Sequence, residues 1–351
     1  MHIEVQSHFY LPDRSDERVP GILTFNTESA GTLTLIGELP RLNSDGLRIL
    51  GETMNNIYTL EDCFETYSDR INLRQVLHVQ RLLVGIGYEK EELIVADRLS
   101  VHLANLTHWL RSSEYGDALK FRELPNGEGW TISCEQVARS SVTIPAGTLR
   151  LGQSRGLTGD GITSRSLTQT ASFDVEFKGE RSVEDVIEFA SDLQDMVSMA
   201  TDRPAVFEKV LLWHADIHQE VGDGRRVPVP VEYLANWIAQ PDANSRPPSD
   251  HDMVFTFEEL GGIEGAARWL DVAEKYRTML GAVMATRYAS KMFVQDRFLE
   301  RMAALEGFHA AKSGMTSLGL LNRLQDLTET AGDPARRWCH RRRCPVPAAD
   351  R

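Results

Sequence analysis

The sequence predicts an α+β protein, in which a β-rich N-terminal domain of sandwich or open-barrel type precedes an incomplete C-terminal α-helical bundle. Two patterns predict this fold class. Apolar and polar residues alternate with a period of two through much of the first 250 residues, and the period becomes helical after about residue 262. We therefore expect a β-rich domain at 1–255, a partial helical bundle at 263–333 and a basic tail at 334–351.

The β-rich part consists of short alternating runs that are separated by turn residues. In the first sixty residues these runs are 22–25, 31–37 and 47–51. Later runs with the same pattern are 76–84, 93–103, 130–134, 142–144 and 171–177. Short antiparallel strands with tight connections fit this pattern best.

One helix is predicted inside the β-rich part. Ser182 is followed by Val-Glu-Asp, which gives an N-cap with acidic residues in the first turn. Val186, Leu193 and Val197 follow at helical spacing, and Pro204 ends the helix. The sequence Gly-Asp-Gly at 222–224 then predicts a hairpin.

Two features of this part have a structural and a chemical interpretation. His214 and His218 are four residues apart, and they form either a solvent-facing polar row of the hairpin or a pair of metal or substrate ligands. The glycines at 152, 156, 159 and 161 predict a flexible loop rather than a phosphate-binding loop, because no Gly-Lys-Ser/Thr sequence follows them.

The C-terminal part is predicted to be helical. Each of two long helices carries one stripe of side chains at helical spacing: Trp269, Val272, Ala273, Tyr276, Leu280 and Val283 in the first helix, and Phe298, Met302, Leu305 and His309 in the second. We expect these two long helices to pack as an antiparallel pair. A third helix is predicted at 317–330, and no fourth follows, so the bundle is expected to leave an apolar groove.

Composition limits the possible functions. The 51 acidic residues outnumber the 38 basic ones and give a net charge of −13, so RNA is expected to bind only where Arg or Lys residues cluster locally. Neither a leader sequence nor a long apolar stretch is recognisable, which predicts a cytoplasmic protein that does not contact a membrane. The four cysteines lack a repeating spacing and are expected to be reduced, and we expect no cofactor and no metal.

Several segments together resemble a known family. Residues 9–12, 19–23, 33–37, 49–53 and 58–60 are similar, in order, to the opening of the ApeA N-terminal domain. Segments 106–109, 193–204 and 298–309 extend the resemblance to about residue 330. The resemblance implies a C-terminal HEPN bundle, a fold whose active members cut RNA as dimers and whose ApeA branch defends bacteria against phage by abortive infection. It thus implies RNA and a second copy of the chain as partners, and it leaves the phage or host trigger open.

The RNA-cutting residues of the HEPN fold are an Arg and a His separated by four to six residues near the end of the bundle. The predicted helices show no such pair there, and Arg336 and His340 in the tail are separated by only three residues. Metal-free RNA cleavage needs a base near the 2′-hydroxyl group and a cation near the phosphate. We therefore expect this chain to be a weak or inactive ribonuclease.

Four residues of the second long helix are the remaining candidates for chemistry. Glu306 and His309 lie one turn apart and are candidate catalytic residues; alternatively, they are a surface Glu and a half-buried His. Arg297 and Arg301 are candidate RNA contacts, or they pair with nearby acidic residues such as Glu300.

The tail at 334–351 differs from the rest of the chain, because it contains six Arg and one Asp. It is either a frameshifted read-through or a native basic arm. Cys339, His340 and Cys344 lack the fourth ligand of a zinc site. Three functions stay open at this point: a defence ribonuclease, a non-enzymatic sensing or binding module that dimerises through its helices, and the product of a decayed gene.

Overall fold

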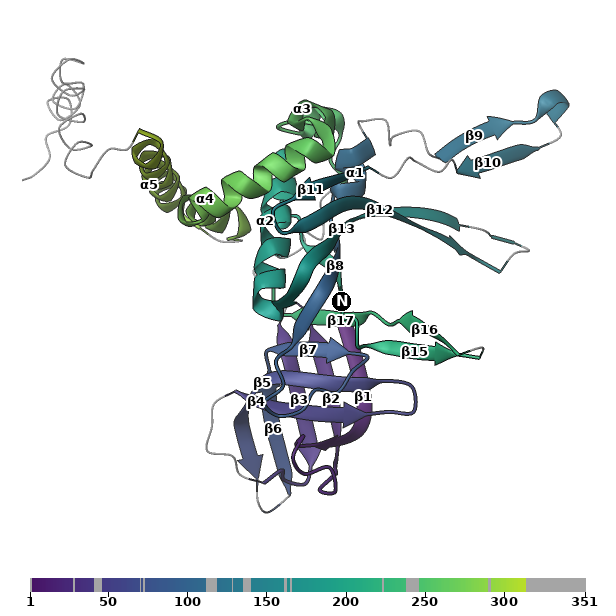
Figure 1. Cartoon of the computed structure of the whole chain (residues 1–351), viewed down its shortest axis with the longest axis vertical. Coiled ribbons are helices and arrows are strands. Elements are labelled where there is room, and N and C mark those ends of the chain that lie inside the picture. Colours follow the sequence, from purple (N-terminus) through teal and green to yellow (C-terminus); the bar gives the residue numbers. More distant parts are fainter. Residues whose placement is uncertain are drawn as a thin grey trace, which may run out of the picture. The chain divides into compact units, whose positions relative to one another are not determined.

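The computed structural model describes residues 2–313 except 28, 41–45, 70, 72, 112–118, 128, 135–139, 161–162, 165, 223, 238–245 and 290–291. It confirms the α+β fold class, because a β-rich part precedes the helices (Figure 1). The chain divides into two compact units: the first is Met1–Lys275 with Arg287–Ser290, and the second is Tyr276–Thr286 with Lys291–Arg351. The predicted domain limits at 255 and 263 remain a prediction.

The first six strands close into a barrel. They are β1 (His2–Tyr10), β2 (Val19–Asn26), β3 (Ala30–Ile36), β4 (Leu47–Glu52), β5 (Ile57–Asp69) and β6 (Arg74–Val79). They pair in the order β5-β4-β1-β2-β3-β6, and β6 pairs back with β5. The side chains that fill the interior are apolar and almost fully buried: Phe9, Leu23, Phe25, Leu33, Leu35, Ile49, Leu60, Leu77 and Val79. The barrel interior is therefore a packed apolar core.

Closure of the barrel depends on the long strand β5. One edge of β5 pairs with β4, whereas its other edge pairs first with β7 (Arg81–Val84) and then with β6. The predicted strand at 76–84 is thus two strands that separate at Gln80. The second half of β5 was not foreseen, because its side chains from Phe64 to Ser68 are exposed and do not alternate.

The same sheet continues beyond β7 as an open sheet. Its further strands are β8 (Val95–Leu103), β11 (Ser141–Ile144), β12 (Gly147–Thr158), β13 (Ser166–Ser182), β14 (Phe207–Trp213) and β17 (Val231–Ala235). They run in the order β11-β12-β13-β8-β14-β17-β7. Two helices lie between these strands in the sequence: α1 (Leu106–Arg111) follows β8, and α2 (Val183–Thr201) follows β13.

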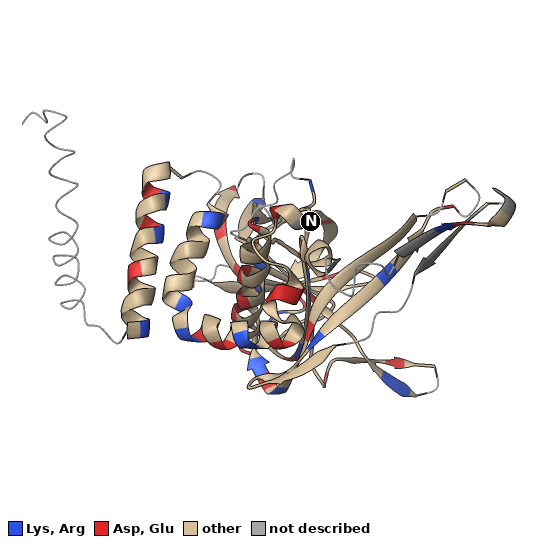
Figure 2. Ribbon diagram, turned by 90° about the horizontal axis from the view of Figure 1, so that it is seen from above, with Lys and Arg blue, Asp and Glu red and all other residues tan. Residues whose placement is uncertain are grey.

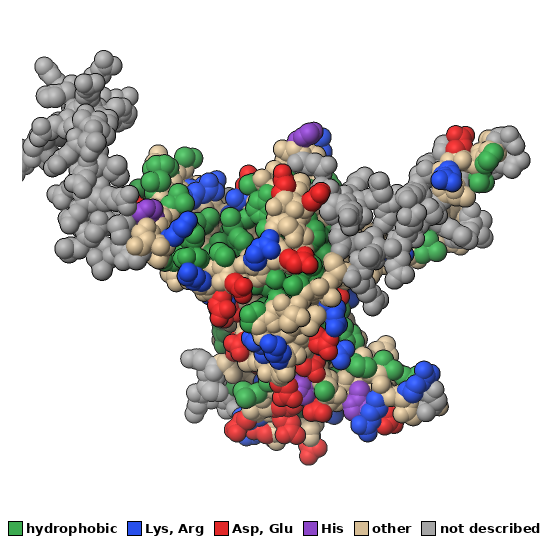
Figure 3. Space-filling model, turned by 45° about the horizontal axis from the view of Figure 1, so that its top comes forward, with side chains coloured by type: hydrophobic (Ala, Val, Ile, Leu, Met, Phe, Trp, Pro, Cys, Tyr) green, Lys and Arg blue, Asp and Glu red, His purple; other side chains and the backbone are tan. Residues whose placement is uncertain are grey.

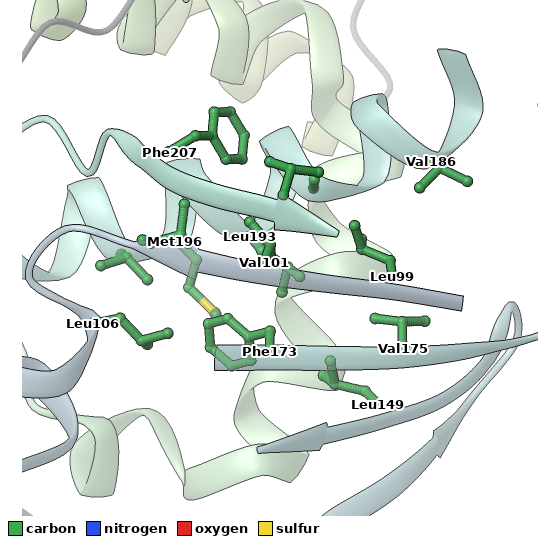
Figure 4. Packing of buried hydrophobic residues seen from close by; sticks show 14 of the residues in the cluster. Leu99, Val101, Leu106, Leu149, Phe173, Val175, Val186, Leu193, Met196 and Phe207 are labelled. Atoms are coloured by element: carbon green, nitrogen blue, oxygen red, sulfur yellow. The ribbon is translucent and has the colours of Figure 1, made fainter. Parts of the chain in front are cut away.

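Helix α2 covers one face of the open sheet. Its side chains Val186, Leu193 and Met196 join the buried cluster that contains Val101 and Phe173 of the sheet (Figure 4). The predicted start of this helix is confirmed, because the Ser182 side chain accepts a hydrogen bond from the Asp185 N–H at 3.2 Å. The chain leaves the helix at Asp202, whose φ is 53°.

Two hairpins form separate two-stranded sheets: β9 (Leu119–Glu123) with β10 (Trp130–Cys134), linked by the short helix η1 (Pro125–Gly127), and β15 (His218–Val221) with β16 (Arg225–Pro228). The second confirms the hairpin predicted around residues 222–224. The flexible loop predicted from the glycines at 152–161 was wrong for Gly152 and Gly156, because β12 stays paired with β13 from Gly147 to Thr158. Gly159 follows the strand, and position 161 lies outside the described residues.

The helices that follow are η2 (Asp250–Asp252), α3 (Phe257–Leu260), α4 (Gly262–Tyr288) and α5 (Val294–Ser313). The predicted antiparallel pair is present. The Tyr276 ring of α4 lies 4.6 Å from the Phe308 ring of α5, and Arg301 Nε donates to Thr286 Oγ1 at 3.1 Å, so later residues of α4 meet earlier residues of α5. Residue Tyr276 has a non-helical backbone, which kinks α4.

The stripe predicted for the second helix does not face α4. Phe298, Met302 and Leu305 are 62%, 40% and 59% exposed, whereas Ala304 is buried. Hydrophobic side chains accordingly come to the surface over the helical region (Figure 3). The helix predicted at 317–330 and the tail at 334–351 lie outside the described residues. Within the described part, none of the helices has the length and apolar character needed to span a membrane.

Candidate functional site

The residues proposed from the sequence lie on α5. Glu306 and His309 are both exposed, and they are one turn apart. Arg301 donates to Thr286, and Arg297 is half-buried. Charges of both signs are interspersed over the described helices rather than gathered in one basic patch (Figure 2). The catalytic and RNA-contact roles of these four residues stay predictions.

The spacing of an Arg and a His with four residues between them occurs elsewhere, at Arg246 and His251. Sequence reasoning overlooked this pair because it considered only the helical part. Both side chains are exposed, on a segment with two prolines that leads into η2. The Arg246 carbonyl oxygen accepts a hydrogen bond from the Arg203 guanidinium. The pair therefore does not lie on an apolar helix, where the resemblance would place it.

The two histidines near the hairpin have different surroundings. The His214 side chain is only 12% exposed, and its Nε2 lies 3.1 Å from a carboxylate oxygen of Glu180. His218 Nδ1 lies 3.0 Å from the carbonyl oxygen of Asp216. The expectation of a solvent-facing row was therefore wrong for His214. Among the described residues, no three His, Cys, Asp or Glu side chains are grouped so that they could hold a metal ion.

The open sheet carries a polar cluster on the face opposite α2. Because side chains alternate along a strand, the apolar residues Leu99 and Val101 of β8 face α2, whereas Ser100 and His102 point to the other face. The neighbouring strands add their own polar residues in register, since Ser100 pairs with Asp174 and His102 pairs with Lys209. We call Ser100, His102, Ser172, Asp174 and Lys209 the polar sheet face.

Asp174 is the centre of the polar sheet face. Its Oδ1 accepts hydrogen bonds from Ser100 Oγ at 2.6 Å and from Ser172 Oγ at 2.9 Å. Gly152 on β12 makes room for this arrangement, because a Cβ atom there would lie 2.2 Å from Asp174 Oδ2 and 2.3 Å from Ser172 Oγ. The glycine therefore serves close packing of a polar cluster rather than flexibility.

The surroundings of His102 favour its uncharged form. Burial lowers the pKa of His102, the positive charge of Lys209 acts in the same direction, and the Asp174 carboxylate opposes both. A neutral imidazole offers one hydrogen-bond donor and one acceptor. Beside it, the Lys209 side chain is exposed and supplies a positive charge.

This arrangement favours binding over hydrolysis. In a hydrolytic triad the imidazole lies between the hydroxyl nucleophile and the carboxylate. Here the hydroxyl groups of Ser100 and Ser172 donate directly to Asp174, so the carboxylate fixes the two hydroxyl groups instead of orienting a base. The polar sheet face thus combines two buried serine hydroxyl groups, which Asp174 holds in place, with a half-buried imidazole and an exposed ammonium group.

The face continues along the β12–β13 ribbon. From Gly152 to Thr158, the cross-strand pairs on this side of the ribbon consist of glycine, serine and threonine: Gly152 with Ser172, Ser154 with Thr170, Gly156 with Thr168, and Thr158 with Ser166. Ser154 Oγ and Thr170 Oγ1 are hydrogen-bonded at 2.5 Å. The polar surface is therefore longer than the cluster around Asp174, and it is rich in hydroxyl groups.

Sequence reasoning missed this surface. The available signal was the alternation in 99–103 and 171–177, where each polar residue stands between two core residues. The alternation shows that the polar residues share one face within each strand. It does not show which strands are neighbours, and β8 lies beside β13 and β14 only in the folded sheet.

The comparisons with known proteins concern this same region. The family model described as ApeA N-terminal domain 1 matches residues 4–266, which is more than half of the 351 residues. No curated protein and no solved structure matches the chain. The match begins in β1 and ends in α4, so it includes the barrel, the open sheet and α2.

Proposed function

The chain belongs to the ApeA family of anti-phage defence proteins, and we propose that its matched region senses infection by binding a polar ligand on the polar sheet face. One observation carries this proposal. The open sheet buries one face under α2, whereas the opposite face holds a fixed cluster of hydroxyl, carboxylate, imidazole and ammonium groups. Such convergent polar groups suit the recognition of a ligand of phage or host origin.

The defence function is tested by counting plaques. Bacteria that express the chain are compared with bacteria that carry an empty vector, over a panel of unrelated phages. The proposal predicts fewer plaques for at least one phage when the chain is present. Equal plaque counts for every phage, with the protein detected in the cells, would count against it.

We propose that the chain associates with a second copy through α5. The exposed side chains Phe298, Met302 and Leu305 form a stripe along this helix, and Leu299 beside them is 63% exposed. Burial of apolar surface stabilises an interface by about 25 cal/mol per Å². A second copy that covers the same stripe would remove these side chains from water in a symmetric contact.

Self-association is tested by sedimentation of the purified chain. The proposal predicts a dimer that Leu305→Glu converts into a monomer. Glu300→Gln is the matched control, since Glu300 is an exposed polar residue of the same helix, and it should leave the dimer intact. A wild-type chain that stays monomeric at micromolar concentration would contradict the proposal.

RNA cleavage of the HEPN kind is the second candidate function, and the family resemblance supports it. His309 lies at helical spacing from Leu305 and Met302, so a dimer through the stripe would bring His309 to its interface. Purified protein is incubated with tRNA and mRNA. Cleavage that disappears in Glu306→Ala or His309→Ala would support a ribonuclease, and cleavage lost in Arg246→Ala or His251→Ala would assign it to that pair instead.

A further inference from the structure

The two ends of α4 are held on the first compact unit in different ways. At the start of the helix, Ile263, Ala266 and Leu270 are buried in the same apolar cluster as the open sheet. At its end, Arg287 and Tyr288 meet polar groups of α2. Apolar burial holds the start of α4, together with one hydrogen bond from Trp269 Nε1 to the Asp192 carbonyl oxygen, whereas polar contacts hold its end.

The contacts at the end of α4 form one network. Tyr288 Oη donates to Asp195 Oδ1 at 2.6 Å and lies 3.1 Å from Ser198 Oγ. Arg287 Nη1 donates to the Ser198 carbonyl oxygen at 3.2 Å and forms an ion pair with Asp202. Asp195 is on the side of α2 opposite to its core residues, so these contacts lie outside the hydrophobic core.

One buried group at this contact is left without a partner among the described residues. The Nε atom of Arg287 is buried and makes no hydrogen bond. In water this group would be hydrogen-bonded, so separation of Arg287 from α2 recovers an interaction that the closed arrangement lacks. This lowers the free energy needed to open the contact.

We propose that Asp195, Ser198, Asp202, Arg287 and Tyr288 form a latch that fastens the end of α4 to α2 and that opens while the apolar core stays folded. The latch gives the chain a closed state and an open state that differ at the end of α4. The proposal is independent of the ligand of the polar sheet face.

The charged groups at the latch make its opening depend on pH. On α2 these groups are Asp192, Asp195 and Asp202, and on α4 they are Glu274 and Arg287, with Tyr288 beside them. Burial raises the pKa of Asp195 to about 6, and burial together with Asp195 and Glu274 raises the pKa of Asp192 to about 7.

The direction of the pH effect follows from these shifts. Opening exposes the Asp195 carboxyl group to water and returns its pKa toward the ordinary value of 3.8, whereas Asp192 lies beside the part of α4 that stays in place. The closed state therefore holds more protons than the open state between about pH 4 and pH 6. A rise of pH through this range favours the open latch.

Hydrogen exchange of the full chain tests the latch. Tyr288→Phe removes the hydrogen bond to Asp195 and should speed exchange at residues 283–289 roughly tenfold, while exchange at 263–270 stays unchanged. Tyr67→Phe is the matched control, because Tyr67 is 53% exposed in the barrel, and it should change neither segment. The proposal is overturned if Tyr288→Phe leaves 283–289 unchanged or speeds both segments equally.

A second variant, Asp195→Asn, is expected to keep the fold and to remove the titratable carboxyl group at position 195. Asp195→Asn retains an oxygen that can accept from Tyr288 but has no charge. Relative to intrinsic rates, wild-type exchange at 283–289 should be faster at pH 8 than at pH 5.5, and Asp195→Asn should reduce this difference. An identical pH dependence in the variant would show that Asp195 does not control the latch.

Discussion

Asp174 and Gly152 illustrate how single residues define the candidate site. The Asp174 carboxylate accepts hydrogen bonds from two serine hydroxyl groups, and Gly152 on the neighbouring strand leaves space for this carboxylate. From the sequence, Gly152 had indicated a loop, because glycine frequency alone does not distinguish flexibility from close packing. By contrast, Ser182 was identified as an N-cap, because capping depends on neighbours within the same four residues.

The packing at Gly152 gives the first prediction. Gly152→Ala should destabilise the protein by about 1–3 kcal/mol, because the new Cβ atom would lie 2.2 Å from Asp174 Oδ2. Gly179→Ala is the control, since no atom lies within 4 Å of a Cβ atom built there. Urea unfolding measures both variants. Equal effects at the two positions would show that the space beside Asp174 is not restricted.

The two buried carboxyl groups of α2 give the second prediction. Asp192 and Asp195 have raised pKa values, so the folded state binds more protons than the unfolded state between about pH 4 and pH 7. Their contribution therefore makes the free energy of unfolding decrease as pH rises through this range. Urea unfolding of the wild type and of Asp192→Asn/Asp195→Asn at pH 5 and pH 7.5 should show a smaller decrease in the variant, and an unchanged decrease would contradict this.

At the scale of elements, local patterns predicted what local interactions determine. The helix α2, the hairpin β15–β16 and the pairing of α4 with α5 all follow from signals within one or two segments. The second half of β5 and the outer part of the β12–β13 ribbon, at 152–158 and 166–170, were missed, because these segments are exposed or half-buried on both sides and lack an apolar face. The exposed stripe of α5 differs from these strands, because its apolar pattern is clear in the sequence. The pattern predicts a buried face, but it does not show which surface packs against that face.

The cap of α2 gives the third prediction. Ser182→Ala removes the acceptor for the Asp185 N–H and should lower stability by about 1 kcal/mol. Ser191→Ala is the control within the same helix. Ser191 Oγ donates to the Ile187 carbonyl oxygen, which lies inside the helix and does not depend on the serine hydroxyl group for a hydrogen-bond partner. Thermal unfolding should separate the two variants. A loss at Ser191 as large as that at Ser182 would contradict the capping role.

At the scale of the whole molecule, one continuous sheet joins the barrel to the open sheet, and both lie inside the family match. The α+β class and the order of a β-rich part before helices were predictable, because they depend on the period of the apolar pattern. The closure of the barrel and the strands that neighbour β8 could not be predicted, because strand order is set by contacts between segments far apart in the sequence. The barrel surface is acidic in places (Figure 3), in agreement with the net charge of −13.

The most direct test of the account is phage protection by variants of the polar sheet face. Lys209→Ala and His102→Ala change this face, and Lys90→Ala is the control, since Lys90 pairs only with Asp13 at the surface of the barrel in the described structure. We predict that the wild type and Lys90→Ala reduce plaque counts, whereas Lys209→Ala and His102→Ala lose this protection and keep the wild-type unfolding temperature. Full protection by the two face variants would contradict the proposed sensing role of this surface.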